Sequence, residues 1–517
     1  MNNESKQEAQ YVMKAKKIYT MDEESPSADW VLVEGKRIKA VGNGEAPTGY
    51  LVREFEDAVV FPGLIDTHVH AGTTAVMLSG VNLIEVTCVQ EALDLIEERC
   101  RTTEDDIVFA AFYIEPQINE GRFPTKKELD RISNGKKVMV TSITLHSSSV
   151  NTETFQALGF SEDLPGLGKD ENGEFNGLLG IDEVQLKALN ILMGLISEER
   201  YLQYIEDFGK MAVENGLTTV HCLEGQFVKE DKDLDIWMEK IDSGDLPFHC
   251  VLYPQLWDYE RAKKYNLPRH GGCLTLDGAD MDFTMALDEP YTCKPEVRGD
   301  LINKDSDVYQ LVKRAHMDEK QCAFHAMGER AIDQVLDAYR RVIAEQGDKK
   351  LRHRIEHFTL PRLSHIELAA KLGCVVCQQP EYSYLFDTPG GPVEQWFGVE
   401  RASTRFEHYK MVKDSGVVVA GGSDAPVNSL NPLTGIHGLV NARYDIRRMS
   451  VTEALETYTR CGAYAAFEEE ERGQISEGYY ADFTVLAEDP YEIPEKINEI
   501  EIVATISEGR EVYRKQK

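Results

Sequence analysis

The sequence lacks long apolar runs and is poor in basic residues. It has 517 residues, and 56 Lys and Arg against 89 Asp and Glu leave a formal net charge of −33 with histidine neutral. A surface this negative is repelled by nucleic-acid phosphates and by anionic lipids. No apolar stretch reaches the roughly 20 residues of a membrane span, and residues 1–17 contain no apolar signal-peptide core. We therefore expect a cytoplasmic protein with no nucleic-acid and no membrane partner.

Cysteine is also sparse, with 10 residues in the whole chain. The cysteines are spread from Cys88 to Cys461, unlike the dense disulfide framework of a small secreted domain. Reduced thiols are therefore expected, in agreement with a cytoplasmic location. Internal repeats, low-complexity segments and coiled-coil heptads are absent from the sequence as well. With 42% apolar residues, the chain can bury a large core, in one barrel with additions or in two or three domains.

The two ends of the chain share a β-rich pattern. Short alternating segments separated by Gly, Asn and Asp turns occur in residues 11–60 and again in the last forty or so residues. Between the ends, apolar strand-like segments alternate with longer helical stretches, which is typical of parallel βα units. The sequence therefore predicts one small domain built from residues 1–60 and 475–517, and an α/β domain at 61–474.

The middle of the chain contains more candidate strands than the eight that a βα barrel needs. The candidates are 61–70, 107–114, 137–146, 216–222, 247–253, 271–276, 321–326, 351–358, 373–378 and 416–424. A Gly- and Asp-rich stretch at 164–180 is typical of an irregular loop. We therefore assign the second and third candidates to an insertion at about 80–195, after the first strand of a barrel.

A His-x-His pair ends the first of these candidate strands. His68 and His70 are two residues apart, so on a strand both imidazoles point to the same face. The carboxyl end of a barrel strand is where active sites lie, and imidazole is the commonest metal ligand. The pair alone fits a structural role equally well.

Three further polar residues stand near the ends of later candidate strands. They are His325, His357 and Asp424. A carboxylate that follows a buried strand is costly unless it is paired or bound to a metal. Because the carboxyl ends of parallel strands meet at one rim, these residues and the His-x-His pair together predict a divalent-metal site.

Several segments together resemble the amidohydrolase superfamily, and in particular its YtcJ-like, amidohydrolase-3 branch. They are PGLIDTHVH at 62–70, HAMGERAIDQVLDAY at 325–339, RIEHFTL at 354–360, SDAPV at 423–427, NPLTGI at 431–436 and GQISEGYYADFTVL at 473–486. The resemblance covers essentially the whole chain, and its motifs are specific for the family but not for a substrate. It implies a distorted TIM (β/α)8 barrel plus a small β-sandwich domain built from both termini.

The resemblance also implies a ligand set. His68 and His70 would hold a first metal with Asp424, and a second metal would be held by His325 and His357.

At the bridging position of the family, this chain has a different residue from the usual one. A lysine commonly stands four residues before an Asp-Gly pair, but in this chain the pair is Asp277-Gly278 and the position holds Cys273. A thiolate can bind or bridge zinc, so Cys273 is one candidate ligand. Alternatively, the site holds one metal and Cys273 is a small buried residue.

Hydrolysis assisted by one or two divalent ions, with zinc as the expected metal, is the predicted chemistry. Such an ion lowers the pKa of bound water towards about 7. Asp424 is expected to accept the water proton and to pass it to the leaving nitrogen. The expected bond is an amide-type C–N bond, other than a peptide bond, in a small-molecule substrate.

Candidates for substrate contact are less distinctive. In proteins of similar sequence the position of His146 approaches the substrate, where it would help to stabilise an oxyanion. Glu115, Glu183 and Tyr382 end strand-like or loop segments and are further candidates, although each also fits a structural role. Two other functions stay open, a deaminase of the same superfamily acting on a heterocyclic amine and a non-catalytic binding relative. A homo-oligomer is left open as well.

Overall fold

The computed structural model describes residues 10–143, 147–180, 182–225 and 232–516. The chain folds into two compact units. Unit 1 comprises Met1–Val69, Gly209–Leu223 and Lys240–Lys517, and unit 2 comprises His70–Phe208 and Glu224–Glu239. Among the described residues, every helix is too short or too polar to cross a membrane.

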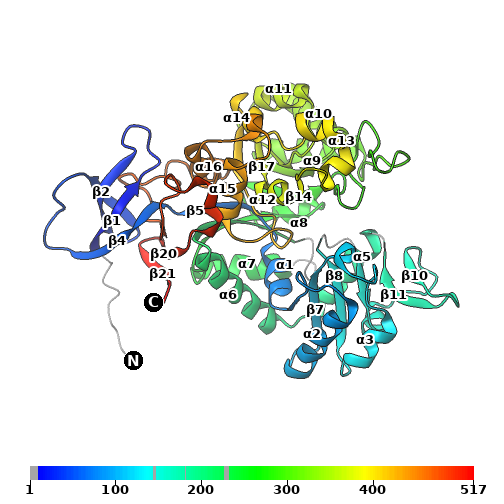
Figure 1. Cartoon of the computed structure of the whole chain (residues 1–517). Coiled ribbons are helices and arrows are strands. Elements are labelled where there is room, and N and C mark those ends of the chain that lie inside the picture. The colour runs from blue at the N-terminus through cyan, green and yellow to red at the C-terminus, as the bar shows by residue number, and fades with distance from the viewer. Residues whose placement is uncertain (1–9, 144–146, 181, 226–231, 517) are drawn as a thin grey trace. The chain divides into compact units, whose positions relative to one another are not determined.

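Strands from both ends of the chain form one seven-stranded sheet in unit 1, where the blue and red segments lie side by side (Figure 1). Its order is β21-β20-β19-β4-β1-β2-β3. The strands are β1 (Gln10–Tyr19), β2 (Ser27–Glu34), β3 (Arg37–Gly42), β4 (Leu51–Pro62), β19 (Phe483–Leu486), β20 (Ile502–Ser507) and β21 (Arg510–Arg514). Because the described strands make a single sheet, the expected β-sandwich is not confirmed.

Eight further strands of unit 1 make two sheets, and every strand predicted outside the insertion is found among them. One sheet has the strand order β13-β12-β5, and the other has the order β14-β15-β16-β17-β18. In the second sheet, all neighbouring strands are parallel. The strands are β5 (Leu64–Val69), β12 (Leu217–Glu224), β13 (His249–Pro254), β14 (Arg269–Thr275), β15 (Gln321–Ala326), β16 (Arg354–His357), β17 (Val375–Gln378) and β18 (Val418–Gly421). The fold is therefore mixed α/β, but a closed TIM barrel is not confirmed by the hydrogen bonding of the described strands.

Helices follow most of the parallel strands of unit 1. They are α8 (Tyr259–Lys263), α9 (Asp305–Met317), α10 (Glu329–Gln346), α11 (Leu363–Leu372), α12 (Pro380–Phe386), α13 (Pro392–Thr404), α14 (Tyr409–Asp414), α15 (Pro432–Val440), α16 (Val451–Thr457) and α17 (Arg460–Ala465).

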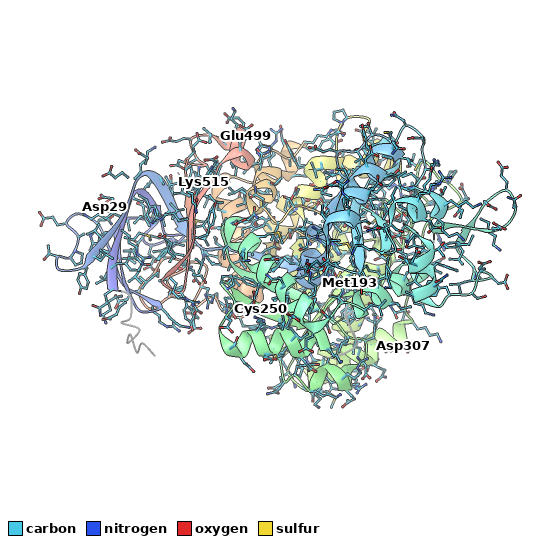
Figure 2. All side chains as sticks on the ribbon, turned by 90° about the horizontal axis from the view of Figure 1, so that it is seen from below. Asp29, Met193, Cys250, Asp307, Glu499 and Lys515 are labelled. Atoms are coloured by element: carbon cyan, nitrogen blue, oxygen red, sulfur yellow. The ribbon has the colours of Figure 1, made fainter. Side chains whose placement is uncertain are left out.

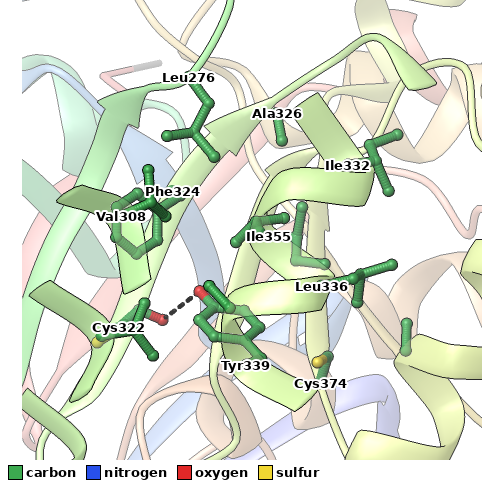
Figure 3. Close-up of a cluster of buried hydrophobic side chains, with 14 of the residues drawn as sticks. Leu276, Val308, Cys322, Phe324, Ala326, Ile332, Leu336, Tyr339, Ile355 and Cys374 are labelled. Carbon is green, nitrogen blue, oxygen red and sulfur yellow. Dashed lines mark hydrogen bonds between the residues drawn. The ribbon is translucent and has the colours of Figure 1, made fainter. Parts of the chain in front are cut away.

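Helix α10 shows how such a helix orients the strand beside it. Cys322, Phe324 and Ala326 of β15 belong to a buried apolar cluster with residues of α10 (Figure 3). The Tyr339 hydroxyl of α10 donates to the carbonyl oxygen of Cys322 at 3.3 Å. Since successive strand side chains point to opposite faces, His325 faces away from this cluster.

Unit 2 contains a separate six-stranded sheet of order β10-β11-β9-β8-β7-β6. Its strands are β6 (Val81–Asn82), β7 (Ile107–Tyr113), β8 (Lys137–Ser142), β9 (Ser148–Val150), β10 (Leu167–Lys169) and β11 (Phe175–Leu179). The helices α1 (Ala71–Leu78), α2 (Val89–Thr102), α3 (Lys126–Ile132), α4 (Thr152–Leu158) and α5 (Asp182–Gly194) belong to it, whereas α6 (Glu198–Glu214) and α7 (Lys232–Ser243) cross its boundaries. The two strands assigned to an insertion, now β7 and β8, therefore pair with each other and not with the parallel strands of unit 1.

Several of the charged side chains labelled in Figure 2 lie at the exterior of the molecule. Asp29, Asp307 and Glu499 are exposed, whereas Met193 and Cys250 are buried (Figure 2). Acidic side chains are also found in the interior, where Glu356 and Asp277 are fully buried.

Candidate metal centre

The carboxyl ends of five strands of unit 1 bring five of the predicted ligands together. Cys273 lies in β14, His325 in β15, His357 in β16 and His68 in β5, and Asp424 follows β18. The first four side chains are buried, and the carboxylate of Asp424 retains 16% of its exposure. The site is therefore almost closed, with a carboxylate at its accessible side.

Cys273 lies between two imidazoles. Its Sγ is 3.6 Å from His325 Nδ1 and also 3.6 Å from His357 Nε2. The ligand atoms of His68, Cys273 and His357 all lie within 4.8 Å of one another. A zinc ion with bonds of about 2.3 Å to sulfur and about 2.0 Å to nitrogen would hold tetrahedral S and N ligands about 3.6 Å apart. The observed donors therefore fit a divalent ion with mixed sulfur and nitrogen ligands.

Electrostatics favour the ligand form of this thiol. Burial raises the pKa of the Cys273 thiol, but the neighbouring His68, His325 and His357 outweigh it and hold this pKa well below the ordinary value. For the His68 imidazole, burial acts in the opposite direction and lowers the pKa. The neighbouring Asp424 and Cys273 outweigh burial and raise the pKa of His68 well above the ordinary value. Since the thiolate is the form that binds metals, the charge distribution around Cys273 favours binding of a cation.

Asp424 is fixed next to His68 through both backbone and side chain. Its backbone N–H donates to the carbonyl oxygen of His68 at 2.8 Å. The side-chain atoms Asp424 Oδ1 and His68 Nε2 are 3.2 Å apart. Asp424 has φ 58°, in the left-handed region that non-glycine residues seldom adopt. Such a conformation is typical of functional sites, where the surrounding structure holds it in place.

His357 departs from regular strand geometry in the same way. On a regular strand His357 and its neighbour Glu356 would face opposite sides. His357 has φ 70°, which turns the chain at this residue. Both side chains thereby contact the same group of residues, with Glu356 at His68 and His357 at Cys273.

Two partners of the imidazoles are absent from the sequence-based prediction. Glu356 Oε2 accepts from His68 Nδ1 at 2.7 Å, and Gln379 Oε1 accepts from His357 Nδ1 at 2.8 Å. The sequence contained one signal for the first, since Arg354 and Glu356 are two residues apart and share a face of β16. Nothing in the sequence indicates Gln379.

His325 has weaker partners. Its Nε2 lies 3.4 Å from the Gly278 carbonyl oxygen and 3.6 Å from Asp277 Oδ1. The Asp277 carboxylate accepts backbone N–H groups of Ala286 at 2.9 Å and of Gly328 at 2.8 Å. The Asp277-Gly278 pair, which marks the bridging position in the sequence, therefore also lies next to the predicted ligand His325.

Three of the remaining predicted residues, His70, Glu115 and Glu183, belong to unit 2. His70 directly follows β5 and is the first residue of unit 2, so its role as a ligand stays a prediction. Glu115 begins a short 3-10 helix, Glu115–Gln117, in unit 2, where burial raises its pKa. Glu183 belongs to α5, but its side chain lies outside the described residues, as does all of His146.

Tyr382 is the one predicted substrate contact in unit 1. It is buried in α12, four residues after the end of β17, and its hydroxyl donates to Asp280 Oδ1 at 2.5 Å. It belongs to an apolar cluster with Met327 and Leu360, which follow His325 and His357 in the chain. The structure thus places Tyr382 at the same end of the strands as the ligands.

Comparison with known proteins assigns the chain to a family. The protein-family model described as "Amidohydrolase family" matches residues 52–513 of the chain. The protein YtcJ of Bacillus subtilis (strain 168) is 30% identical over 532 residues, which cover 96% of this chain and 98% of that protein. The N-substituted formamide deformylase of Arthrobacter pascens is 24% identical, over 95% of this chain and 96% of the relative.

A solved structure shows the same fold. An uncharacterized metal-dependent hydrolase from Pyrococcus furiosus superposes with a TM-score of 0.77 at 22% identity, covering 93% of this chain and 100% of that one. The match to the family model, in contrast, rests on the sequence and spans most of the chain. The protein therefore belongs to the amidohydrolase family.

Proposed function

We propose that the protein is a metal-dependent hydrolase that cleaves an amide-type C–N bond of a small molecule. The observation that carries this proposal is the Asp424 carboxylate, partly exposed and 3.2 Å from His68 Nε2 beside the Cys273 and His357 donors. A general base thus stands next to a donor set that suits a divalent ion. The similarity to a deformylase of N-substituted formamides supports a C–N bond as the target.

One or two zinc ions are the proposed cofactor, because thiolate and imidazole donors together suit zinc. When bound, such an ion supplies a nucleophilic hydroxide at neutral pH and polarises the substrate carbonyl. Asp424 accepts the proton that the attacking water loses and then donates it to the leaving nitrogen. We also propose His70 as a ligand and Tyr382 as a wall of the substrate site.

A closed barrel is proposed as the frame of this site. Val69, at the end of β5, and Ala425, after β18, form a parallel bridge that connects the two sheets of unit 1. At the other edge, Tyr253 of β13 and Cys273 of β14 belong to one buried cluster. Both edges of the two sheets are thus adjacent, which supports closure into one (β/α)8 barrel.

The test is metal analysis followed by a substrate screen on the full-length protein. N-substituted formamides, N-acyl amino acids and aryl amides are assayed for release of a carboxylate and an amine, cyclic ureides for ring opening to a ureido acid, and heterocyclic amines for release of ammonia. We expect bound zinc and turnover of at least one amide class. Turnover of heterocyclic amines alone would identify a deaminase instead, and protein that binds no metal would contradict a metal-dependent hydrolase.

A further inference from the structure

Resting on the proposed function, we infer that Glu356 is a positioning residue for the metal centre. Glu356 fixes the His68 imidazole with Nδ1 as hydrogen-bond donor and Nε2 directed to the ligand side, and it thereby raises the affinity for a divalent metal. The contact is His68 Nδ1 to Glu356 Oε2 at 2.7 Å, and both side chains are fully buried.

The carboxylate of Glu356 is itself held in one orientation. Arg354, two residues earlier on the same face of β16, donates from Nε to Oε1 and from Nη2 to Oε2, both at 2.9 Å. Paired hydrogen bonds of this kind between guanidinium and carboxylate fix geometry as well as charge. Glu356 Oε2 therefore remains a charged acceptor at a fixed place, and His68 Nδ1 must supply the proton.

The Arg354 guanidinium is anchored in turn. Nη1 donates to the Tyr253 hydroxyl at 2.7 Å and to His221 Nδ1 at 2.9 Å, and Nη2 donates to the Thr67 carbonyl oxygen at 2.8 Å. With the two bonds to Glu356, these contacts engage all five guanidinium N–H groups. Thr67 immediately precedes His68, so the same arginine fixes the backbone that carries the ligand and the carboxylate that orients it.

Among the described residues, the other two imidazoles of the site have no carboxylate at hydrogen-bond distance, since Asp277 Oδ1 lies 3.6 Å from His325 Nε2. His357 Nδ1 contacts the Gln379 amide oxygen at 2.8 Å, and His325 Nε2 lies 3.4 Å from the Gly278 carbonyl oxygen. A carboxylate raises the basicity of a ligand imidazole, and loss of such an outer partner typically costs about 10–100-fold in metal affinity. Among the three, His68 is therefore the ligand whose strength depends most on its partner.

The experiment measures metal affinity without activity. Metal-free wild-type protein and the Glu356→Gln variant are titrated with Zn²⁺ in competition with a chromophoric chelator. We expect affinity to fall about 10–100-fold in Glu356→Gln. The matched control is Asp333→Asn, which removes a histidine–carboxylate contact of 2.9 Å to His365 of α11, away from the site. Its affinity is expected to equal that of the wild type.

A second variant and a spectroscopic signature separate positioning from folding. Glu356→Asp keeps the negative charge beside Arg354 but withdraws it from His68, so it is expected to fold and still to bind Zn²⁺ more weakly than wild type. In ¹⁵N-histidine spectra of the zinc form, the strongly hydrogen-bonded Nδ1–H of His68 should shift in both variants and stay unchanged in Asp333→Asn.

The outcomes distinguish this inference from the proposed function. Wild-type affinity in both Glu356 variants, with an unchanged His68 signal, would overturn the positioning role and leave the hydrolase proposal standing. If wild-type protein itself binds no Zn²⁺, the proposed function fails first, and the inference that rests on it fails with it.

Discussion

Single residues decide the chemistry of the site, and Asp424 is the one assigned to proton transfer. In Asp424→Asn the side chain keeps its size but can no longer accept a proton. We expect kcat to fall by about 10²–10⁴ while bound metal, measured by elemental analysis, is retained. Near-wild-type turnover by a metal-loaded Asp424→Asn protein would remove this residue from the mechanism.

For Cys273 the sequence leaves two interpretations open, a metal ligand or an ordinary buried thiol. Its sulfur lies 3.6 Å from nitrogen atoms of both His325 and His357, which favours the ligand. In Co²⁺-loaded protein we expect a thiolate-to-cobalt charge-transfer band that disappears in Cys273→Ser. The control is Cys322→Ser, which changes another buried cysteine, on β15, whose pKa is raised by burial alone. If the band persists in Cys273→Ser, the sulfur is not a ligand.

Sequence reasoning indicated candidate ligands that the structure brings together, but not their hydrogen-bond partners. His68, His325 and Asp424 could be predicted because strand ends are visible as apolar runs followed by a polar residue. Glu356 and Gln379 could not, because whether a side chain reaches an imidazole depends on the register between strands. The positive φ values of His357 and Asp424 are likewise set by tertiary context, which the residue pattern does not reveal.

At the scale of elements, all ten predicted strand segments contain a strand. Buried parallel strands are continuous apolar runs, so their positions are among the strongest signals in a sequence. How strands join into sheets is a different matter, since it depends on distant pairing. The pairing of β4 with β19 connects residues more than 400 positions apart, and no local pattern specifies it.

Helix α9 and the residue before strand β16 are connected by a pair of buried histidines, His316 and His353. His353 Nδ1 accepts from the Cys322 backbone N–H at 2.9 Å, so its proton is on Nε2, which lies 3.1 Å from His316 Nδ1. His316 Nε2 then donates to the Gly347 carbonyl oxygen at 3.0 Å. Burial lowers the pKa of His353 to about 3 and also lowers that of His316.

Acid should therefore weaken the protein through this pair. Below the ordinary histidine pKa of about 6.5 the unfolded chain binds protons that the native pair does not. The free energy of unfolding is expected to fall by up to about 1.4 kcal/mol per pH unit for His353, until the pH approaches the native pKa of about 3. Urea unfolding followed by circular dichroism measures it. In His353→Gln, which cannot titrate, the decline should be shallower, and an unchanged slope would contradict the assignment.

The molecule as a whole consists of two compact units with separate sheets, and the predicted ligands His68, Cys273, His325, His357 and Asp424 belong to unit 1. A ligand that binds only the native state stabilises it by mass action, by about 2.7 kcal/mol at a free concentration of about 100 times Kd. Zn²⁺ should therefore raise the thermal midpoint of unit 1, and a chelator should lower it again.

Calorimetry of the metal-free protein at increasing Zn²⁺ concentration tests this coupling, with His357→Ala as the variant that lacks a ligand. The wild-type midpoint should rise steadily with the logarithm of the free metal concentration once it exceeds Kd, because each tenfold increase adds about 1.4 kcal/mol to native-state stability. The variant should show a much smaller rise. Equal shifts in both proteins would mean that Zn²⁺ binds at other groups, such as the many surface carboxylates, and that the buried sulfur and imidazole set contributes nothing to metal binding.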